Sequence, residues 1–234
     1  MLQTFDSRNT DLQININGEL FHRNVAGISP FDSAVQGGDG VWEGLRLYNG
    51  KIFKLEEHLN RLRHSAQAMA FSVIPTNEEL TAELTKTLQA NNMEDGVHIR
   101  LTLSRGKKIT SGMDPRLNQD GNTLIVLAEF KSPVYDATGL TLASSSIRRF
   151  SPDMLDQKIH NCNLIQSIMA KIEATASGAD DALMLDSRGF IAETNATHLF
   201  FVKDGYVCTP RTVACPEGVT RQTVIDLCHE HDID

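Results

Sequence analysis

The 234-residue sequence has no apolar run approaching the about 20 residues of a membrane-spanning helix, and its longest, Thr123–Phe130, has strand length. It also lacks an excess of positive charge, since 22 lysines and arginines against 30 aspartates and glutamates give a formal net charge of −8. Nucleic acids and anionic membrane surfaces bind clustered Lys and Arg, so neither is expected as a main partner. The first residues lack the basic and apolar segments of a signal peptide, and we expect a cytoplasmic protein.

The four cysteines form no CxxC pair, so a disulfide framework is not expected. Cys228 opens the string CHEH, but four consecutive residues of a helix point in four directions and cannot converge on one metal ion. We therefore expect no metal site. The sequence also lacks the nucleotide loop GxxxxGK[ST] and the catalytic motifs HExxH and GxSxG.

Hydrophobic residues make up 41% of the chain, enough for a sizeable core. Alternating apolar and polar residues around Asn17-Gly18 and Asn49-Gly50 predict two β-hairpins, because both turn residues need a positive φ. Apolar residues at helical spacing predict two helices, and alternation predicts two strands after them. The helices cover 56–71 and 77–91, and the strands cover 98–104 and 122–130.

After Phe130 the pattern starts again. We expect a strand over 140–145, a helix over 163–177 with Leu164, Ile168 and Ile172 on one stripe, three short strands within 181–208, and a last helix over 219–231. The predicted fold class is α/β (mixed α+β), with an N-terminal domain over 1–130, a linker over 131–138 and a C-terminal domain over 139–234.

Four stretches carry the functional information: 31–66, 155–174, 183–205 and 216–227. In this order they resemble the class IV (fold-type IV) pyridoxal-phosphate enzymes, most closely the branched-chain amino acid aminotransferases. The resemblance covers almost the whole chain. It implies a two-domain fold with the site where the domains meet, a pyridoxal 5'-phosphate cofactor, amino acid and 2-oxo acid substrates, and a homodimer.

The cofactor needs a lysine for covalent attachment and an acid that keeps its ring nitrogen protonated. The resemblance identifies the lysine as Lys158, in LDQKIHNC, just before an apolar helix where desolvation could lower its pKa. It identifies the acid as Glu193, in AETNATHLF. The alternative for each is an ordinary solvated side chain.

The phosphate is expected to be held in two ways. Arg61, in EEHLNRL, matches the family arginine that pairs with the phosphate. Val219 and Thr220 open the last helix, where backbone N–H groups and the Thr220 hydroxyl form an anion site, and Gly218 allows close approach of the backbone. The alternatives are a helix arginine beside Glu57 and a simple helix cap.

The substrate-binding residues depart from the family pattern. Gly37 stands where family aminotransferases have a pocket tyrosine, and His98 stands near the place of a second one. Arg100 and Arg105 lie where family members place groups that bind the substrate carboxylate. For Arg105 a solvated loop arginine is an equal alternative.

Transamination of a branched-chain-like amino acid with a 2-oxo acid is the predicted reaction. Three alternatives stay open: a D-amino-acid aminotransferase, an aminodeoxychorismate lyase, and a non-catalytic relative that keeps the fold. Family members continue beyond the last helix, so we expect a C-terminally truncated fragment that leaves apolar residues exposed. A closed C-terminal domain with Ile225 and Leu227 buried would contradict this expectation.

Overall fold

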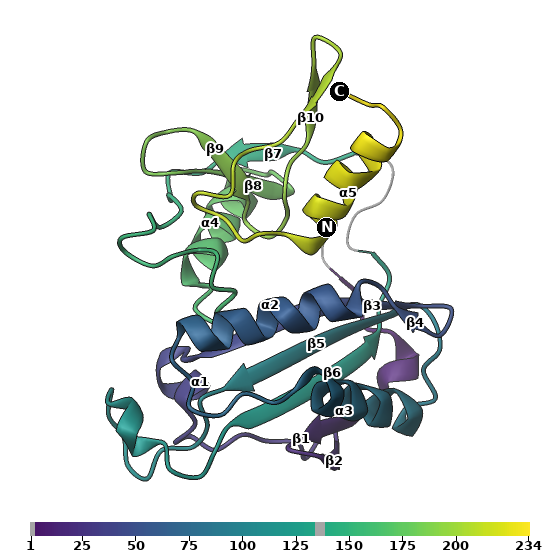
Figure 1. Ribbon diagram of the computed structural model, residues 1–234, viewed down its shortest axis with the longest axis vertical. Coiled ribbons are helices and arrows are strands. Elements are labelled where there is room, and N and C mark those ends of the chain that lie inside the picture. The colour runs from purple at the N-terminus through teal and green to yellow at the C-terminus, as the bar shows by residue number, and fades with distance from the viewer. Residues whose placement is uncertain (1–2, 134–138) are drawn as a thin grey trace. The chain divides into compact units, whose positions relative to one another are not determined.

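The computed structural model of the protein describes residues 3–133 and 139–234, and the chain divides into two units (Figure 1). Of the described residues, the N-terminal unit takes 3–133 and 159–163, and the C-terminal unit takes 139–158 and 164–234. Residues 159–163 thus belong with the N-terminal unit, although they lie beyond the expected boundary. Residues 134–138 of the expected linker lie outside the described residues. No helix in the described ranges is long and apolar enough to cross a membrane.

Six antiparallel strands form the sheet of the N-terminal unit, in the order β2-β1-β6-β5-β3-β4. They are β1 (Gln13–Ile16), β2 (Glu19–His22), β3 (Gly40–Tyr48), β4 (Lys51–Ile52), β5 (Val97–Ser104) and β6 (Thr123–Phe130). Both predicted hairpins are confirmed, as β1-β2 and β3-β4. Asn17 and Asn49 have φ angles of 53° and 47°, and the glycine after each also has a positive φ, as such two-residue turns require.

Three helices accompany this sheet: α1 (Ser33–Gly37), α2 (Leu55–Ala68) and α3 (Asn77–Ala90). There are also two 3-10 turns, η1 (Ser7–Asn9) and η2 (Pro115–Leu117). The start of α3 is fixed by a capping box, in which the Thr76 hydroxyl accepts the Glu79 N–H at 3.2 Å and the Glu79 carboxylate accepts the Thr76 N–H at 2.7 Å. The predicted helices over 56–71 and 77–91 are thereby confirmed to within three residues at each end.

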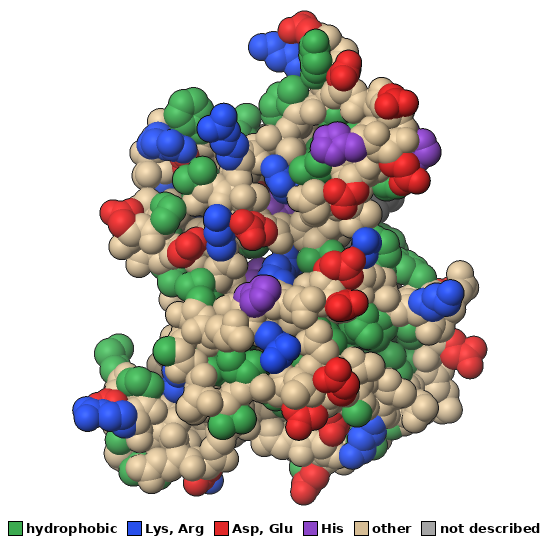
Figure 2. Space-filling view, viewed as in Figure 1, with side chains coloured by type: hydrophobic (Ala, Val, Ile, Leu, Met, Phe, Trp, Pro, Cys, Tyr) green, Lys and Arg blue, Asp and Glu red, His purple; other side chains and the backbone are tan. Residues whose placement is uncertain are grey.

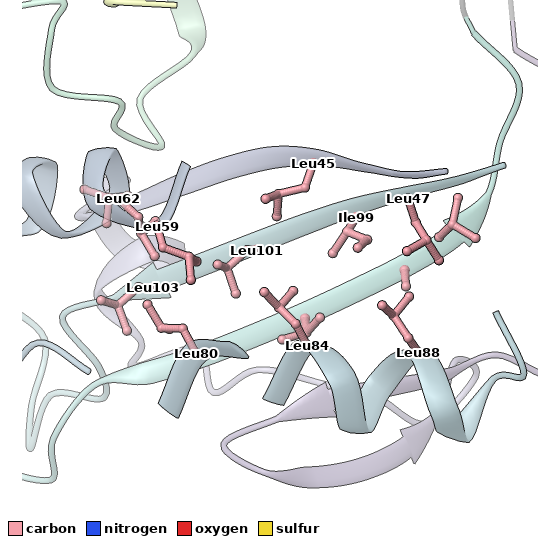
Figure 3. Close-up of a cluster of buried hydrophobic side chains, with 14 of the residues drawn as sticks. Leu45, Leu47, Leu59, Leu62, Leu80, Leu84, Leu88, Ile99, Leu101 and Leu103 are labelled. Carbon is pink, nitrogen blue, oxygen red and sulfur yellow. The ribbon is translucent and has the colours of Figure 1, made fainter. Parts of the chain in front are cut away.

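The core of the N-terminal unit lies between the sheet and helices α2 and α3. Alternation along β3 and β5 places every second side chain in it, and the apolar stripes of both helices complete it. Figure 3 shows the leucines of the two helices pointing toward those of the strands. The fully buried side chains of this core include Leu45, Leu59, Leu62, Leu80, Leu84, Ile99, Leu101 and Leu103.

The C-terminal unit contains a three-stranded sheet of order β7-β8-β9, a separate hairpin β10-β11 and two helices. Its elements are β7 (Leu142–Ser144), α4 (Ile165–Ala176), β8 (Asp181–Leu185), β9 (Ile191–Thr194), β10 (Phe201–Lys203), β11 (Tyr206–Cys208) and α5 (Val219–Glu230). Strands β7 and β8 are parallel, with α4 as the connection between them, and β9 is antiparallel to β8. The strand and the two helices expected after Phe130 are present, but four strands, β8 to β11, stand where three were expected, because the last expected strand is the hairpin β10-β11.

The buried face of α4 differs from the expected stripe. Ile168 and Ile172 are 53% and 56% exposed, whereas Gln166, Ala170 and Ala174 are buried. The small alanines allow the helix to lie close to β8, where Ala182 and Met184 complete a small cluster. Periodicity located the helix, but the choice of face was decided by side-chain size.

No residue of α5 is buried. Leu227 is 46% exposed and Ile225 is partly exposed, so the closed C-terminal unit that would contradict the expectation of a fragment is not found in the described residues. Charged side chains of both signs are interspersed on the face shown in Figure 2, and no single-sign patch dominates that face.

We predict that Leu84→Ala destabilises the N-terminal unit by roughly 2–5 kcal/mol, because it removes a fully buried side chain and leaves a cavity. Urea unfolding followed by fluorescence of Trp42, the single tryptophan, reports on this unit. Leu20→Ala is the control, since Leu20 is 37% exposed, and it should cost less than about 1 kcal/mol. Equal losses for the two variants would contradict the assignment of the core.

Candidate active site

Lys158 lies in an irregular segment of the C-terminal unit, ahead of α4. Its Nζ is 3.2 Å from Oε1 of Glu217, and the side chain is 50% exposed. The backbone N–H of Lys158 donates to the Asp156 carboxylate at 2.9 Å, which fixes the local turn. The desolvation expected for this lysine is not seen, because α4 begins only at Ile165 and leaves the amine accessible.

The five residues that follow Lys158 are bound to β3 instead. The Trp42 N–H donates to the His160 carbonyl at 3.0 Å, and the Cys162 N–H donates to the Gly40 carbonyl at 2.8 Å. The Trp42 indole N–H donates to the Asn161 carbonyl at 3.0 Å, and its ring stacks on that of His160 with centroids 4.4 Å apart. This pairing explains why residues 159–163 belong with the N-terminal unit.

Arg61 lies on α2 and points to a buried carboxylate on β3. Its Nε and Nη2 donate to the two oxygens of Glu43 at 2.8 and 2.6 Å. The alternative partner named from the sequence, Glu57, instead pairs with Lys54 at 3.0 Å. The guanidinium is 16% exposed, so the structure places Arg61 in a fixed orientation near the surface of the N-terminal unit.

Glu193 lies on β9 and is buried. The Arg149 guanidinium is 3.0 Å from its carboxylate and also donates to the Thr194 carbonyl at 2.8 Å. Burial raises the pKa of Glu193 to about 7, against the opposing attraction of Arg149. Nδ1 of His198 lies 3.9 Å from the second carboxylate oxygen. Because burial and Arg149 act on this pKa in opposite directions, a further positive group placed beside the carboxylate would lower the pKa and favour the ionised form.

Gly218 is the N-cap of α5, and that helix has no side-chain cap. A Cβ at residue 218 would overlap Nε2 of His198, so any larger residue would displace this imidazole. Val219 and Thr220 form the first turn, where helix N–H groups attract anions.

The structure therefore brings three predicted parts together within the C-terminal unit. Lys158 contacts Glu217, the residue before Gly218, and Gly218 packs on His198. His198 in turn reaches Glu193. A lysine amine, an uncapped helix N-terminus and a buried carboxylate thus form one continuous group, with His198 as the connecting side chain.

Glu193, His198 and Cys215 also offer one possible metal-ligand atom each, within 4.8 Å of one another. Arg149 already supplies a cation to this carboxylate. Burial and the nearby Glu193 raise the pKa of the Cys215 thiol to about 12, and a protonated thiol is a poor metal ligand. We assign no metal to these residues.

The sheet face opposite the core carries the predicted substrate residues of β5. In the β3-β5 register, Gly44 is opposite Arg100 and Arg46 is opposite His98. The Arg100 guanidinium lies 4.0 Å from the centroid of the Trp42 ring. Burial, reinforced by neighbouring cations, lowers the pKa of His98 to about 4, so this imidazole is neutral at pH 7.

Gly37 and Arg105 are placed differently. Gly37 ends α1, is exposed, and has nothing within 4 Å of the position of an added Cβ. Arg105 pairs with both oxygens of Asp39 at 2.7 and 3.1 Å and donates to the carbonyls of Met69 and Ala70 at 2.8 and 3.2 Å. These contacts use its guanidinium to tie the loop after β5 to the end of α2, which favours a structural role over the binding of a substrate carboxylate.

Six residues that contact the predicted site residues or one another were not predicted from the sequence: Glu43, Trp42, His58, His160, Arg149 and His198. One signal could have revealed the first of them. Val41, Glu43, Leu45 and Leu47 share one face of β3, so a carboxylate interrupts an otherwise apolar row. A charge at a core position is expected to be paired. The remaining residues carry no such local signal.

The family model described as "Amino-transferase class IV" matches residues 40–234. "Branched-chain-amino-acid aminotransferase-like protein 2" of Arabidopsis thaliana is 54% identical over 220 residues, which are 94% of this chain and 39% of that protein. The "Putative branched-chain-amino-acid aminotransferase" of Methanocaldococcus jannaschii is 35% identical, over 95% of this chain and 77% of its own.

Solved structures give the same result. A branched-chain aminotransferase from Thermoproteus uzoniensis, with norvaline, superposes with a TM-score of 0.85 at 28% identity and covers 95% of this chain and 76% of its own. The branched-chain amino acid aminotransferase from Thermobaculum terrenum, in its PLP-form, gives a TM-score of 0.81 at 25% identity, over 95% and 74%. The chain spans about two fifths of the length of the Arabidopsis relative and about three quarters of the others.

The raised pKa of Glu193 predicts a pH dependence of stability for the cofactor-free protein. Between the ordinary value of 4.5 and about 7, the folded protein holds a proton that the unfolded chain releases, so the free energy of unfolding falls as the pH rises through this range. The loss is on the order of 3 kcal/mol. Chemical denaturation at pH 5 to 8 should show this slope in wild type and in the exposed-site control Glu230→Gln, but not in Glu193→Gln. Parallel profiles for all three would contradict it.

Proposed function

The chain belongs to the class IV aminotransferase family, and from this premise we propose that it catalyses pyridoxal 5'-phosphate-dependent transamination between a branched-chain-like amino acid and a 2-oxo acid. The carrying observation is the continuous group in the C-terminal unit that joins Lys158, the N-terminus of α5 and Glu193 through His198. Each of these meets one chemical requirement of the cofactor: an amine, an anion site and an acid.

The residues present fit the cofactor. Lys158 is half exposed, so its amine is accessible to an aldehyde, and the acceptor oxygen of Glu217 lies 3.2 Å away. The first turn of α5 has no side-chain cap, which leaves its N–H groups to an anionic ligand. We assign phosphate binding to this turn, at Gly218, Val219 and Thr220, and we propose Arg61 separately as a phosphate-binding residue, as the family resemblance implies.

The cofactor, when bound, supplies an electron sink for the charge left at the substrate Cα. Lys158 is the proposed catalytic residue: its Nζ would hold the cofactor covalently and, once the substrate amine had displaced it, the freed amine would accept the Cα proton as a general base. Glu193 would hold the protonated ring nitrogen, whose positive charge would favour the ionised form of this carboxylate. Arg149 and the surrounding strands hold that carboxylate in place and exclude water from it.

Arg100 and His98 are proposed as substrate-binding residues. Arg100 is cationic and stacked on Trp42, so it can pair with a carboxylate in a fixed orientation. His98, which is neutral at pH 7, offers a hydrogen bond without repelling Arg100. Gly37 contributes open space in place of a side chain. Arg105 is left out of the proposed site, because Asp39 and the carbonyls of Met69 and Ala70 together take up all three of its guanidinium nitrogens.

We also propose a homodimer, which the family likeness supports, and the cytoplasmic location expected from the sequence. Light scattering of the purified protein tests the first, and fractionation of the native host tests the second. Both stand as parts of the proposal.

A set of substrates tests the proposed reaction against the three alternatives. Cofactor-loaded protein mixed separately with L-leucine, L-glutamate, D-alanine and an (R)-amine should lose the visible band of the bound cofactor with L-leucine and L-glutamate. Loss with D-alanine alone selects a D-amino-acid aminotransferase. Release of pyruvate from aminodeoxychorismate without an acceptor selects the lyase, and a protein that never takes up cofactor is a non-catalytic relative.

We predict that Lys158→Ala prevents covalent attachment of pyridoxal 5'-phosphate and leaves the fold intact, because the side chain is half exposed and its ion pair with Glu217 is on the surface. Borohydride reduction of loaded wild type, followed by peptide mapping, should place the pyridoxyl group on residue 158. Lys203→Ala, at an exposed lysine of the same unit, is the control and should label like wild type. Label on another lysine in the wild type would refute the assignment.

Matched substitutions of Arg100 and Arg105 test which of the two arginines binds the substrate carboxylate. Arg100→Gln should raise KM for the 2-oxo acid about tenfold to a hundredfold, the cost of losing a charge-assisted hydrogen bond. Arg105→Gln should leave KM within about threefold and instead lower the melting temperature, since it removes the ties to Asp39 and α2. Steady-state kinetics and thermal melts on both variants decide between them, and the reverse pattern would place the carboxylate at Arg105.

A further inference from the structure

Glu43 is a carboxylate in the middle of an apolar core. It lies on β3 between Val41 and Leu45 on the face covered by α2, and it is 0% exposed. An unpaired charge at such a depth is very costly, and a buried pair is tolerated only where hydrogen bonds satisfy both partners. The side chains that reach Glu43 are therefore informative about what it does.

Two of these side chains come from one face of α2. Arg61 donates from Nε and Nη2 to both oxygens, at 2.8 and 2.6 Å, and His58 Nδ1 lies 2.6 Å from Oε2. The two residues are three positions apart, which places them together on the helix surface. Burial alone would raise the pKa of Glu43, but the hydrogen bonds from His160, His58 and Arg61 lower it far below its ordinary value. The carboxylate is therefore ionised, and its bidentate pairing fixes the plane of the Arg61 guanidinium.

The third side chain comes from the segment after Lys158. His160 Nδ1 is 3.5 Å from Oε1 of Glu43 and 2.5 Å from the Trp42 carbonyl. The His160 N–H donates to the Ser65 hydroxyl of α2 at 3.0 Å. Residues 159–163 are thus held against β3 and α2, and Ile159 is covalently joined to Lys158.

We propose that Glu43 is a positioning residue for the cofactor: it sets the orientation of Arg61 for the phosphate and anchors the segment that carries Lys158. The inference rests on the proposed function, because it assigns Arg61 and Lys158 their roles. One buried carboxylate thus pairs both with Arg61 and with His160 of the segment that directly follows Lys158.

A purely structural ion pair would have a different signature. Loss of Glu43 would then weaken binding of pyridoxal and of pyridoxal 5'-phosphate equally, through the fold. A positioning role acts on the phosphate alone through Arg61. The ratio of the two dissociation constants, pyridoxal over pyridoxal 5'-phosphate, separates these cases, and we call it the phosphate preference.

The experiment measures the phosphate preference of the full chain by absorbance titration. Glu43→Gln keeps the size of the side chain and removes its charge, and we expect the preference to fall about tenfold or more. Glu57→Gln is the matched control on the same helix, since Glu57 is 49% exposed, and it should keep the wild-type value. In Arg61→Gln the preference should already have fallen by about as much, to what the first turn of α5 supplies, and adding Glu43→Gln should lower it no further.

Hydrogen exchange tests the second half of the inference. The amides of Trp42 and Cys162, which bind the segment to β3, should exchange faster in Glu43→Gln than in Glu57→Gln. Should Glu43→Gln not fold, wild type alone remains decisive: the Nε–H of Arg61, identified by its loss in Arg61→Lys, should exchange slowly in NMR spectra because it donates to a buried acceptor. Fast exchange of that proton would overturn the inference.

The outcomes separate the inference from the proposed function. If wild type binds pyridoxal 5'-phosphate with a clear phosphate preference and Glu43→Gln retains it, the positioning role is wrong and the proposed function stands. If wild type shows no uptake of the cofactor, the proposed function fails and the inference fails with it.

Discussion

The requirement that a buried carboxylate be neutralised shapes both units of this protein. In the N-terminal unit Glu43 is paired with Arg61, and in the C-terminal unit Glu193 is paired with Arg149. The two pairs differ in how far the paired groups offset the effect of burial on the pKa of the carboxylate. Three donors lower the pKa of Glu43 far below its usual value, whereas a single arginine leaves that of Glu193 raised to about 7. The first carboxylate is therefore a fixed anchor, and the second is one whose charge a ligand can change.

That contrast bears on function. A carboxylate that already has all its partners orients its neighbours but gains little from a further cation, which suits a residue that holds Arg61 in place. A carboxylate with an incomplete set of partners gains from a positive ring nitrogen, which suits Glu193 in the proposed function. The same residue type serves two purposes because burial and the number of donors differ.

Local patterns were sufficient for much of the fold. The Asn-Gly pairs specify positive φ angles and so located both hairpins, and helical spacing of leucines located α2 and α3 and their buried faces. The pattern failed on α4, where Ile168 and Ile172 formed the more apolar stripe but Ala170 and Ala174 are buried. A helix that packs close to a small sheet needs small side chains at the contact. The spacing of apolar residues in the sequence does not show how closely the helix packs.

The site was predictable only as far as a resemblance could name single residues. Lys158, Glu193 and Gly218 could be named, but the contacts that organise them join distant parts of the chain. Glu43 meets His160 across more than a hundred residues, and nothing near either residue in the sequence announces the other. The prediction that Lys158 is desolvated was wrong for a related reason. The exposure of this side chain depends on where the residues that follow it are bound.

Arg100 and Arg105 show what the structure adds to such a pattern. Arg100 lies on β5 and Arg105 directly follows that strand. From the sequence, each was a candidate for binding the substrate carboxylate. Strand alternation places Arg100 on the face of β5 opposite the core, where it stacks on Trp42, an aromatic partner that leaves a guanidinium able to pair with an anion. Arg105 lies past the last strand residue, where the chain turns, and Asp39 and two carbonyls just after α2 take up its donors. Because Asp39 and the two carbonyls together occupy Nε, Nη1 and Nη2 of Arg105, the proposed substrate role falls to Arg100.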